Sequence, residues 1–312
     1  MSKRYDVVII GAGPGGMTAA LYASRSNLSV LLLDRGIYGG QMNNTGDIEN
    51  YPGFELTTGP DLSEKMYASA TKFGAEYGYG TVNDVIDHGD YKEVLTDEEN
   101  YEAKTVIIAT GAEHRHLGVP GEEKFSGRGV SYCAVCDAAF FRNKDVVVIG
   151  GGDSALEEGN YLTQVVNKVT IVHRRDQLRA QKILQDRAFA NKKIDFVFDA
   201  QVEDVVGDQK TEGVSYIDKK TGAEKVIPAD GVFIYVGIKP MTDAFKNLGI
   251  TDEFGWIETD EKMRTKVPGI YAIGDVRANQ LRQIVTAVGD GGVAGQEVYN
   301  YLEANNDLSN ES

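Results

Sequence analysis

The strongest constraint on the fold of this chain is a strand–turn–helix–strand pattern that occurs twice. The first copy starts with an apolar run at 6–10, turns through glycines at 11–16, and reaches a second apolar run at 30–34 after a helical stretch. The second copy repeats this order over 145–173. Continuous apolar strands separated by a helix are typical of a parallel sheet that is buried on both faces. The sequence therefore predicts an α/β protein with two similar units.

The remainder of each copy follows one plan, with short alternating strands and then a buried strand that ends in glycine. These segments are expected at 82–102 and 106–111 in the first copy, and at 194–226 and 232–237 in the second. A third segment adds a strand at 269–273 and a long helix at 283–302. We expect two Rossmann-like dinucleotide-binding domains, each a parallel sheet with helices plus a small β-meander.

The glycines of both turns have a specific chemical purpose. The first permits a tight bend and the second lets the backbone approach a pyrophosphate, so that amides at the helix N-terminus face the anion. Such a turn is a strong signal only between a strand and a helix, which is its context in both copies. The alternative, a duplication in which one copy binds nothing, fits the retained glycines less well. The expected contacts are Gly11, Gly13, Pro14 and Gly15 in the first turn, and Gly152, Asp153 and Ser154 in the second.

The end of the next strand distinguishes the two nucleotides. The first copy has Asp34 there, and a carboxylate accepts hydrogen bonds from ribose hydroxyls. The second copy has His173 followed by Arg174 and Arg175, with Arg179 a helical turn later. Guanidinium groups would clamp a 2′-phosphate that a carboxylate would repel. In a chain of net charge -15 this basic patch predicts an NADPH site, the alternative being the solvated start of a helix.

The first copy would then hold FAD. Gly274 and Asp275 follow a buried strand, where an aspartate beside a helix N-terminus can bind the ribitol–phosphate arm of a flavin. Gly-Asp by itself is a common turn, so it counts only together with the glycine fingerprint. Gly40 and Gln41 are either a loop against the flavin or simply a turn.

Composition excludes several classes of protein. The net charge of -15 argues against a nucleic-acid partner. Hydrophobic content of 42% and charged content of 25% are ordinary for a globular protein. No apolar run is long enough for a membrane span or a signal peptide, so we expect a cytoplasmic protein.

The only two cysteines, Cys133 and Cys136, form a CxxC motif that is followed directly by Asp137. Two cysteines in 312 residues make no structural disulfide framework, so this pair indicates redox chemistry or a metal site. Zinc would need further ligands, and the four histidines show no partner spacing. The stretch 134–140 is expected to be helical, and a helix N-terminus lowers the pKa of a thiol.

With these motifs and Arg282-Gln283 in view, the chain resembles the low-molecular-weight thioredoxin reductases of bacteria, which are flavoproteins with two dinucleotide-binding domains. The resemblance covers residues 5–304. It implies an FAD-binding domain made of 1–115 and 246–312, and an inserted NADPH-binding domain at 116–245 that carries the CxxC motif. It also implies a homodimer.

The resemblance further implies that electrons pass from NADPH through FAD to the Cys133–Cys136 disulfide and on to oxidised thioredoxin. Cys136 would face the flavin, and Cys133 would attack the partner. Asp137 would act as a general acid, or else merely cap a helix. Phe140 and Phe141 would form a docking spot for thioredoxin, unless they belong to the core. The further flavin contacts that the resemblance implies are Asn50, Ala109, Thr110, Gly111, Arg282, Gln283 and Ile284.

Three alternatives stay open at this point. The partner could be another small disulfide protein, peroxiredoxin-like or glutaredoxin-like. The chain could be a ferredoxin- or flavodoxin-type NADP reductase with incidental cysteines, which predicts that loss of the cysteines has no effect. It could also be a redox sensor that binds NADPH without turnover.

Overall fold

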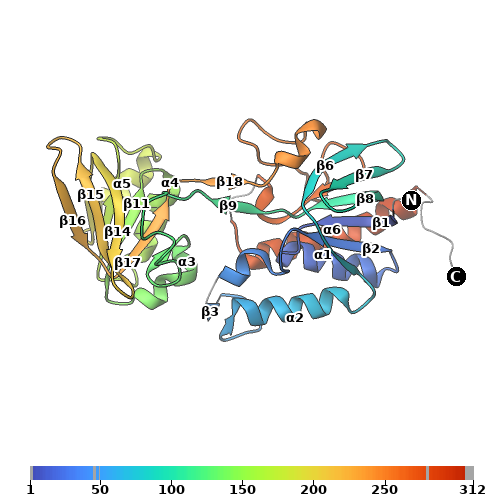
Figure 1. Cartoon of the computed structure of the whole chain (residues 1–312), viewed down its shortest axis with the longest axis horizontal. Helices are drawn as coiled ribbons and strands as arrows, with labels where there is room; N and C mark the ends of the chain where they lie inside the picture. Colours follow the sequence, from blue (N-terminus) through green and yellow to red (C-terminus); the bar gives the residue numbers. More distant parts are fainter. Residues whose placement is uncertain (1–2, 45–46, 49, 279–280, 306–312) are drawn as a thin grey trace. The chain divides into compact units, whose positions relative to one another are not determined.

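The computed structural model describes residues 3–44, 47–48, 50–278 and 281–305. The chain forms two compact units, which we call unit 1 (residues 1–113 and 239–312) and unit 2 (residues 114–238). Strands β9 (Ala112–His114) and β18 (Ile238–Pro240) run between the units and pair with each other (Figure 1).

The chain returns from unit 2 to unit 1 at residue 239, earlier than the expected end of the inserted domain at 245. Residues 239–245 group with unit 1. The physical reason is Phe245, which is 1% exposed and belongs to a core cluster of unit 1.

The sheet of unit 1 follows the order β5-β2-β1-β8, with β19 pairing to the end of β8. Pairing is parallel through this part of the sheet, whereas β7 pairs antiparallel with the start of β8 and β6 follows β7. Its strands are β1 (Lys3–Ile10), β2 (Val30–Asp34), β5 (Glu76–Tyr79), β6 (Val82–Asp87), β7 (Lys92–Thr96), β8 (Tyr101–Ile108) and β19 (Ile270–Ala272).

Unit 2 repeats this topology in the order β13-β12-β11-β17-β10, and all of these pairs are parallel. Its parallel strands are β10 (Val130–Ser131), β11 (Asp145–Gly150), β12 (Lys168–Val172), β13 (Ile194–Val197) and β17 (Gly231–Tyr235). A separate antiparallel sheet contains β14 (Ala200–Gly207), β15 (Thr211–Asp218) and β16 (Glu224–Pro228). The alternating region expected at 194–226 is therefore divided, because β13 joins the parallel sheet beside β12.

The helices start at the two glycine turns, close to the predicted start of the C-terminal helix, and at sites that sequence patterns did not indicate, such as α2. Unit 1 contains α1 (Pro14–Arg25), α2 (Gly59–Thr71), α6 (Ile284–Ala304) and the 3₁₀ helices η1 (Gly40–Asn44), η3 (Asp243–Leu248) and η4 (Gly274–Val276). It also contains the short pair β3 (Asp47–Ile48) and β4 (Thr57–Thr58). Unit 2 contains α3 (Ala134–Asp137), η2 (Ala138–Phe141), α4 (Asp153–Leu162) and α5 (Lys182–Ala190).

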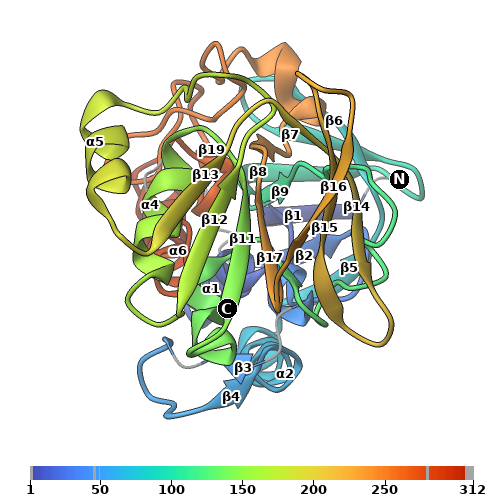
Figure 2. The same ribbon diagram turned by 90° about the vertical axis from the view of Figure 1, so that its left-hand side faces the viewer.

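The strand before each glycine turn contributes side chains to two hydrophobic cores. In β1, Val7 and Ile9 join the cluster formed with α1, α2 and α6, whereas Val8 joins the cluster on the other face. In β11, Val146 packs with α4 and α5, and Val147 packs with β14 and β15 (Figure 2). Successive side chains of a strand point to opposite faces, so a continuous apolar strand serves both layers.

Helices α1 and α6 lie side by side and contact each other through residues without bulk (Figure 1). A Cβ atom at Gly291 would lie 2.3 Å from the Gly15 carbonyl oxygen, and one at Gly295 would lie 2.8 Å from the Ala19 carbonyl oxygen. This close approach holds the start of α6 beside the first glycine turn, although the two segments are far apart in the sequence.

We expect Gly291→Ala to destabilise the protein by about 1–3 kcal/mol relative to Gly289→Ala, because only the first substitution overpacks the α1–α6 contact. A Cβ atom at Gly289 would meet no atom within 4 Å. Both substitutions gain the same helix propensity, so it cancels in the comparison. Urea unfolding of the two variants measures the difference, and equal free energies of unfolding would contradict the expectation.

Candidate functional site

The first glycine turn leaves an open space in front of a helix N-terminus. Gly11 has φ +109°, and a Cβ atom there would lie 2.3 Å from the Ala109 carbonyl oxygen. Gly13 caps α1 without any side-chain hydrogen bond, and a Cβ atom at Gly13 would meet no atom within 4 Å. Pro14 then starts the helix. Free amides at such a position suit a pyrophosphate.

Asp34 connects this turn to the end of β2. Its Oδ2 accepts a hydrogen bond from the Ala12 amide at 2.6 Å, and its Oδ1 accepts one from the Gly36 amide at 2.9 Å. A carboxylate has about four acceptor sites, so capacity remains for ribose hydroxyls. The following loop contacts the same turn, since a Cβ atom at Gly40 would lie 3.3 Å from the Gly13 Cα atom. Gln41 follows Gly40 in η1.

Asp275 and Arg282 carry buried polar atoms that lack partners. Neither Asp275 Oδ1 nor Arg282 Nε has a hydrogen-bond partner among the residues that the structure describes. Burial raises the pKa of Asp275 to about 6, with Arg282 opposing the shift and Asp290 adding to it. The Arg282 guanidinium lies 4.2 Å from the ring centroid of Trp256. These atoms fit the polar arm of a flavin, which would supply the missing partners.

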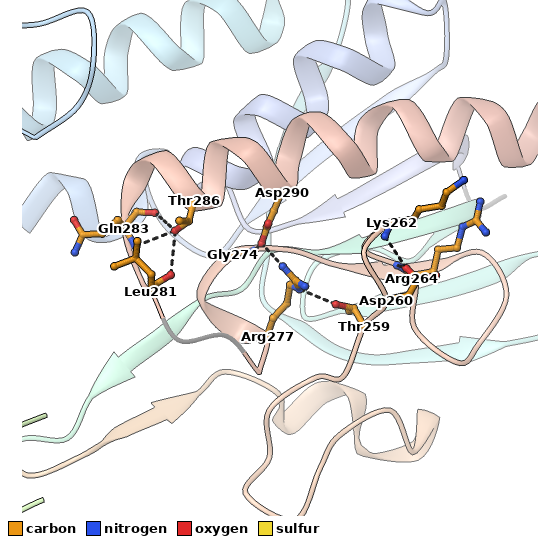
Figure 3. Close-up of polar contacts among 10 residues, drawn as sticks. All are labelled: Thr259, Asp260, Lys262, Arg264, Gly274, Arg277, Leu281, Gln283, Thr286 and Asp290. Carbon is orange, nitrogen blue, oxygen red and sulfur yellow. Dashed lines mark hydrogen bonds and ion pairs between the residues drawn. The ribbon is translucent and has the colours of Figure 1, made fainter. Parts of the chain in front are cut away.

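Asp290 on α6 fixes the turn that presents Asp275. Its Oδ2 accepts from the Gly274 amide at 2.9 Å and from Arg277 Nη1 at 2.7 Å (Figure 3). Arg277 Nε also donates to Thr259 Oγ1 at 2.7 Å. The backbone at Gly274 has φ +68°, a conformation that favours glycine.

Other predicted residues of unit 1 form hydrogen bonds between segments that are far apart in the sequence. Thr110 Oγ1 donates to the Met241 carbonyl at 2.7 Å, and the Met241 amide donates to the Gly111 carbonyl at 3.0 Å. Asn50 Nδ2 donates to Gln283 Oε1 at 3.0 Å. Gln283 caps α6 in a reciprocal capping box with Thr286, and Ile284 is the first residue of that helix (Figure 3).

We expect flavin-free Asp275→Asn protein to be more stable at pH 7 than flavin-free wild type, by up to ~3 kcal/mol. The pKa of Asp275 is raised from 3.8 to about 6 in the folded state, so the folded state binds the proton more tightly than the unfolded state does. Stability from this group is therefore present below pH 4 and is lost as pH rises towards 6. Denaturant titrations from pH 4 to pH 7 measure the slope, which the neutral variant should lack.

Asp290→Asn is the matched control for this titration. It loses charged hydrogen bonds to Gly274 and Arg277, so it should destabilise the protein. Equal pH slopes in wild type and Asp275→Asn would show that the Asp275 carboxyl is not protonated in the folded state.

The second glycine turn has the same open geometry as the first. Gly152 caps α4 without a side-chain hydrogen bond, and a Cβ atom there would meet no atom within 4 Å. Ser154 is exposed in the first turn of α4. The ring of His173 lies against this turn, since a Cβ atom at Gly151 would lie 2.3 Å from His173 Nδ1.

His173 is 5% exposed. The sequence pattern grouped it with the three arginines, but they are exposed and His173 is buried. Burial lowers the pKa of His173, and the three neighbouring arginines lower it further, so the ring is neutral near pH 7. Its Nε2 has no hydrogen-bond partner among the described residues.

Arg174, Arg175 and Arg179 lie on an exposed loop at residues 174–181, which we call the arginine loop. The sequence pattern placed Arg179 on a helix, but α5 begins only at Lys182. The amides that a helix would use internally are engaged elsewhere, since the Arg179 amide donates to the Gly151 carbonyl at 2.7 Å. None of the three arginines forms an ion pair among those that the described residues make.

The cysteines of the CxxC motif form a disulfide with Cα atoms 5.3 Å apart. Cys133 caps α3, and its Sγ accepts a hydrogen bond from the Cys136 amide at 3.2 Å. Ser131 Oγ lies 2.6 Å from Asp137 Oδ2, to which it donates. Burial raises the pKa of Asp137, and the Ser131 hydrogen bond offsets only part of the shift. Asp137 makes no side-chain cap to the helix that follows, which leaves its carboxyl for acid chemistry.

Two residues near the disulfide, Tyr235 and Glu158, were not identified by sequence reasoning. The Tyr235 hydroxyl accepts a hydrogen bond from the Ala134 amide at 2.8 Å. Glu158 on α4 has one buried oxygen, Oε2, without a partner among the described residues. Burial raises the pKa of Glu158, the neighbouring Glu157 carboxylate adds to the shift, and the backbone at Ala134 and Val135 opposes it. A tyrosine at a strand end and a glutamate on an amphipathic helix gave no signal of this proximity.

Phe140 and Phe141 have different environments. Phe141 is 8% exposed and packs edge-on against Phe233 at a centroid distance of 5.2 Å. Phe140 is 46% exposed. Of the two phenylalanines, only Phe140 is therefore accessible beside the disulfide, and Arg142 is exposed as well.

Comparison with known proteins gives a consistent result. The family model described as pyridine nucleotide-disulphide oxidoreductase matches residues 5–291. Thioredoxin reductases of Listeria monocytogenes and Bacillus subtilis are 61% and 59% identical over 302 residues, which is 96% of this chain and 95% and 96% of those proteins. The crystal structure of thioredoxin reductase from Streptococcus pyogenes, at 61% identity, matches with a TM-score of 0.93 over 97% of this chain and 100% of that chain.

Neither a metal-ion cluster nor a membrane-spanning helix occurs among the described residues. Their His, Cys, Asp and Glu side chains form no group of three or more that could hold a metal ion. In the same residues, no helix has both the length and the apolar character that crossing a bilayer requires.

Proposed function

The chain belongs to the pyridine nucleotide-disulphide oxidoreductase family, and we propose that it is an NADPH-dependent thioredoxin reductase. The observation that carries the proposal is the Cys133–Cys136 disulfide beside Asp137, an acid of raised pKa. This pair lies in the unit whose glycine turn is accompanied by the arginine loop. A dithiol next to a proton donor is suited to reducing a disulfide in another protein.

Membership of this family implies a flavin and a pyridine nucleotide. We assign FAD to unit 1, where the Gly13 turn would hold the pyrophosphate, Asp34 the ribose, and Asp275 with Arg282 the polar arm. We assign NADPH to unit 2, with the pyrophosphate at Gly152 and the 2′-phosphate at the arginine loop. Bound flavin would accept a hydride from the nicotinamide and pass two electrons to the disulfide.

The reduced cysteines would then reduce the partner in two exchange steps. The Cys133 thiolate attacks one sulfur of the thioredoxin disulfide, which forms a mixed disulfide and releases one partner thiolate. The Cys136 thiolate next attacks the Cys133 sulfur, which releases the second thiolate and restores the Cys133–Cys136 bond. Asp137 donates a proton to a leaving thiolate, and Ser131 holds its carboxyl in place.

The partner surface and the assembly follow from the same assignment. Phe140 and Arg142, both exposed next to the disulfide, would form the thioredoxin contact in place of the buried Phe141. We also propose a cytoplasmic homodimer, supported by Tyr22 and Val293 being 42% and 39% exposed on the paired helices α1 and α6. Sedimentation of the purified protein should give twice the chain mass of 34.0 kDa, and a monomer would refute the dimer.

We expect the wild-type holoprotein to oxidise NADPH rapidly when oxidised thioredoxin is added under anaerobic conditions. Cys136→Ser should show no turnover, because the disulfide cannot form. Asp137→Asn should be slower by about a hundredfold or more, the usual range for loss of a general acid. Absorbance of NADPH and titration of thioredoxin thiols measure the reaction.

Asp186→Asn is the control, since Asp186 is an exposed carboxylate paired with Lys182 and should not affect turnover. If the flavin is reduced by NADPH but thioredoxin stays oxidised, the partner assignment is wrong and other disulfide proteins become the candidates. If Cys136→Ser reduces thioredoxin as fast as wild type, the disulfide takes no part in the reaction.

A further inference from the structure

We infer that the hydrogen bonds between Asp153 and Gln181 position the arginine loop for a 2′-phosphate, and that Gln181 is therefore a specificity-determining residue. The inference rests on the proposed use of NADPH. It assigns Asp153 a different role from the direct nucleotide contact that its place in the glycine turn predicts.

The contact is bidentate and charge-assisted. Asp153 Oδ1 accepts from the Gln181 amide at 2.7 Å, and Asp153 Oδ2 accepts from Gln181 Nε2 at 2.9 Å. Asp153 is the first residue of α4, and Gln181 is the last residue before α5. The carboxylate therefore joins the pyrophosphate turn to the end of the arginine loop.

The backbone reinforces this connection at the same end of the loop. The amides of Arg179 and Ala180 donate to the Gly151 carbonyl at 2.7 and 3.2 Å. The start of the loop is held separately, because the Asp199 amide donates to the Arg175 carbonyl at 3.1 Å and Lys219 Nζ donates to the Arg174 carbonyl at 3.0 Å. Arg179 is thus the arginine whose position depends most directly on Gln181.

Electrostatic repulsion from a bound pyrophosphate would favour an orientation in which the Asp153 carboxylate faces the arginine loop. A negative side chain at the start of α4 would repel a pyrophosphate at the adjacent amides. Two N–H donors of Gln181 bind both Asp153 oxygens and direct the charge towards the loop. The interaction should therefore favour nucleotides with a 2′-phosphate, whereas the charge of Asp153 should disfavour every dinucleotide.

The first copy of the motif makes the equivalent connection with the opposite polarity. There the carboxylate is Asp34 at the strand end, and the donor is the Ala12 amide in the turn. A carboxylate at the strand end suits ribose hydroxyls but would repel a 2′-phosphate. In the second copy the carboxylate belongs to the turn, and the strand end has His173 in place of an aspartate.

The test measures binding of ADP-ribose and 2′-phospho-ADP-ribose to the holoenzyme by calorimetry, since these ligands differ only in the 2′-phosphate. Gln181→Leu should weaken binding of 2′-phospho-ADP-ribose by about tenfold, near the lower end of the range for loss of one charged hydrogen bond, and leave ADP-ribose binding unchanged, because the backbone amide still holds Asp153 Oδ1. Gln164→Leu is the matched control, because the exposed Gln164 side chain lies in unit 2 but outside the arginine loop, and it should behave as wild type. Asp153→Asn should strengthen ADP-ribose binding and reduce the preference for 2′-phospho-ADP-ribose over ADP-ribose.

The outcomes separate the inference from the proposed function. If wild type binds both ligands equally, the NADPH assignment itself fails. If wild type prefers the 2′-phosphorylated ligand but Gln181→Leu matches Gln164→Leu, the inference is overturned. An equal loss for both ligands in Gln181→Leu would also overturn it, because that result indicates general loosening of the site.

Discussion

Each unit is organised around a backbone turn that has no room for a Cβ atom. A Cβ atom at Gly16 would lie 1.9 Å from the Gly11 carbonyl oxygen, and one at Gly150 would lie 2.6 Å from the Tyr235 carbonyl oxygen. The turns therefore lie directly against neighbouring backbone, and each helix starts where the parallel strands end. Gly13 and Gly152 face open space at that point. Asp34 and the end of the arginine loop are each tied to one of these turns by hydrogen bonds.

The two copies share one scaffold, and their chemistry differs because of a few side chains around the turn. Asp34 places negative charge at the end of β2, whereas His173 at the equivalent place is buried and neutral. The exposed arginines that follow His173 make that end of the sheet basic in a strongly acidic chain. The proposed selectivity for two nucleotides would thus arise from charge placement on one geometry.

Burial raises the pKa of three acids, and the proposed reaction uses one of them, Asp137, as its proton donor. The pKa values of Asp137, Glu158 and Asp275 are all raised, and desolvation is the largest cause in each case. Asp137 lies beside the disulfide, whereas Asp275 Oδ1 lacks a partner in the proposed flavin site. Groups that are costly to bury persist where a ligand or a proton transfer uses them.

The sequence alone determined the two turns, the strands that flank them and the redox-active cysteine pair, because these features depend on local spacing and on residue type. Tertiary structure decided that β13 joins the parallel sheet and that Phe141 is buried. It also decided that Asp153 binds Gln181, which lies 28 positions further along the chain. No periodicity encodes such contacts, since they depend on side-chain direction and on which distant segments pack together.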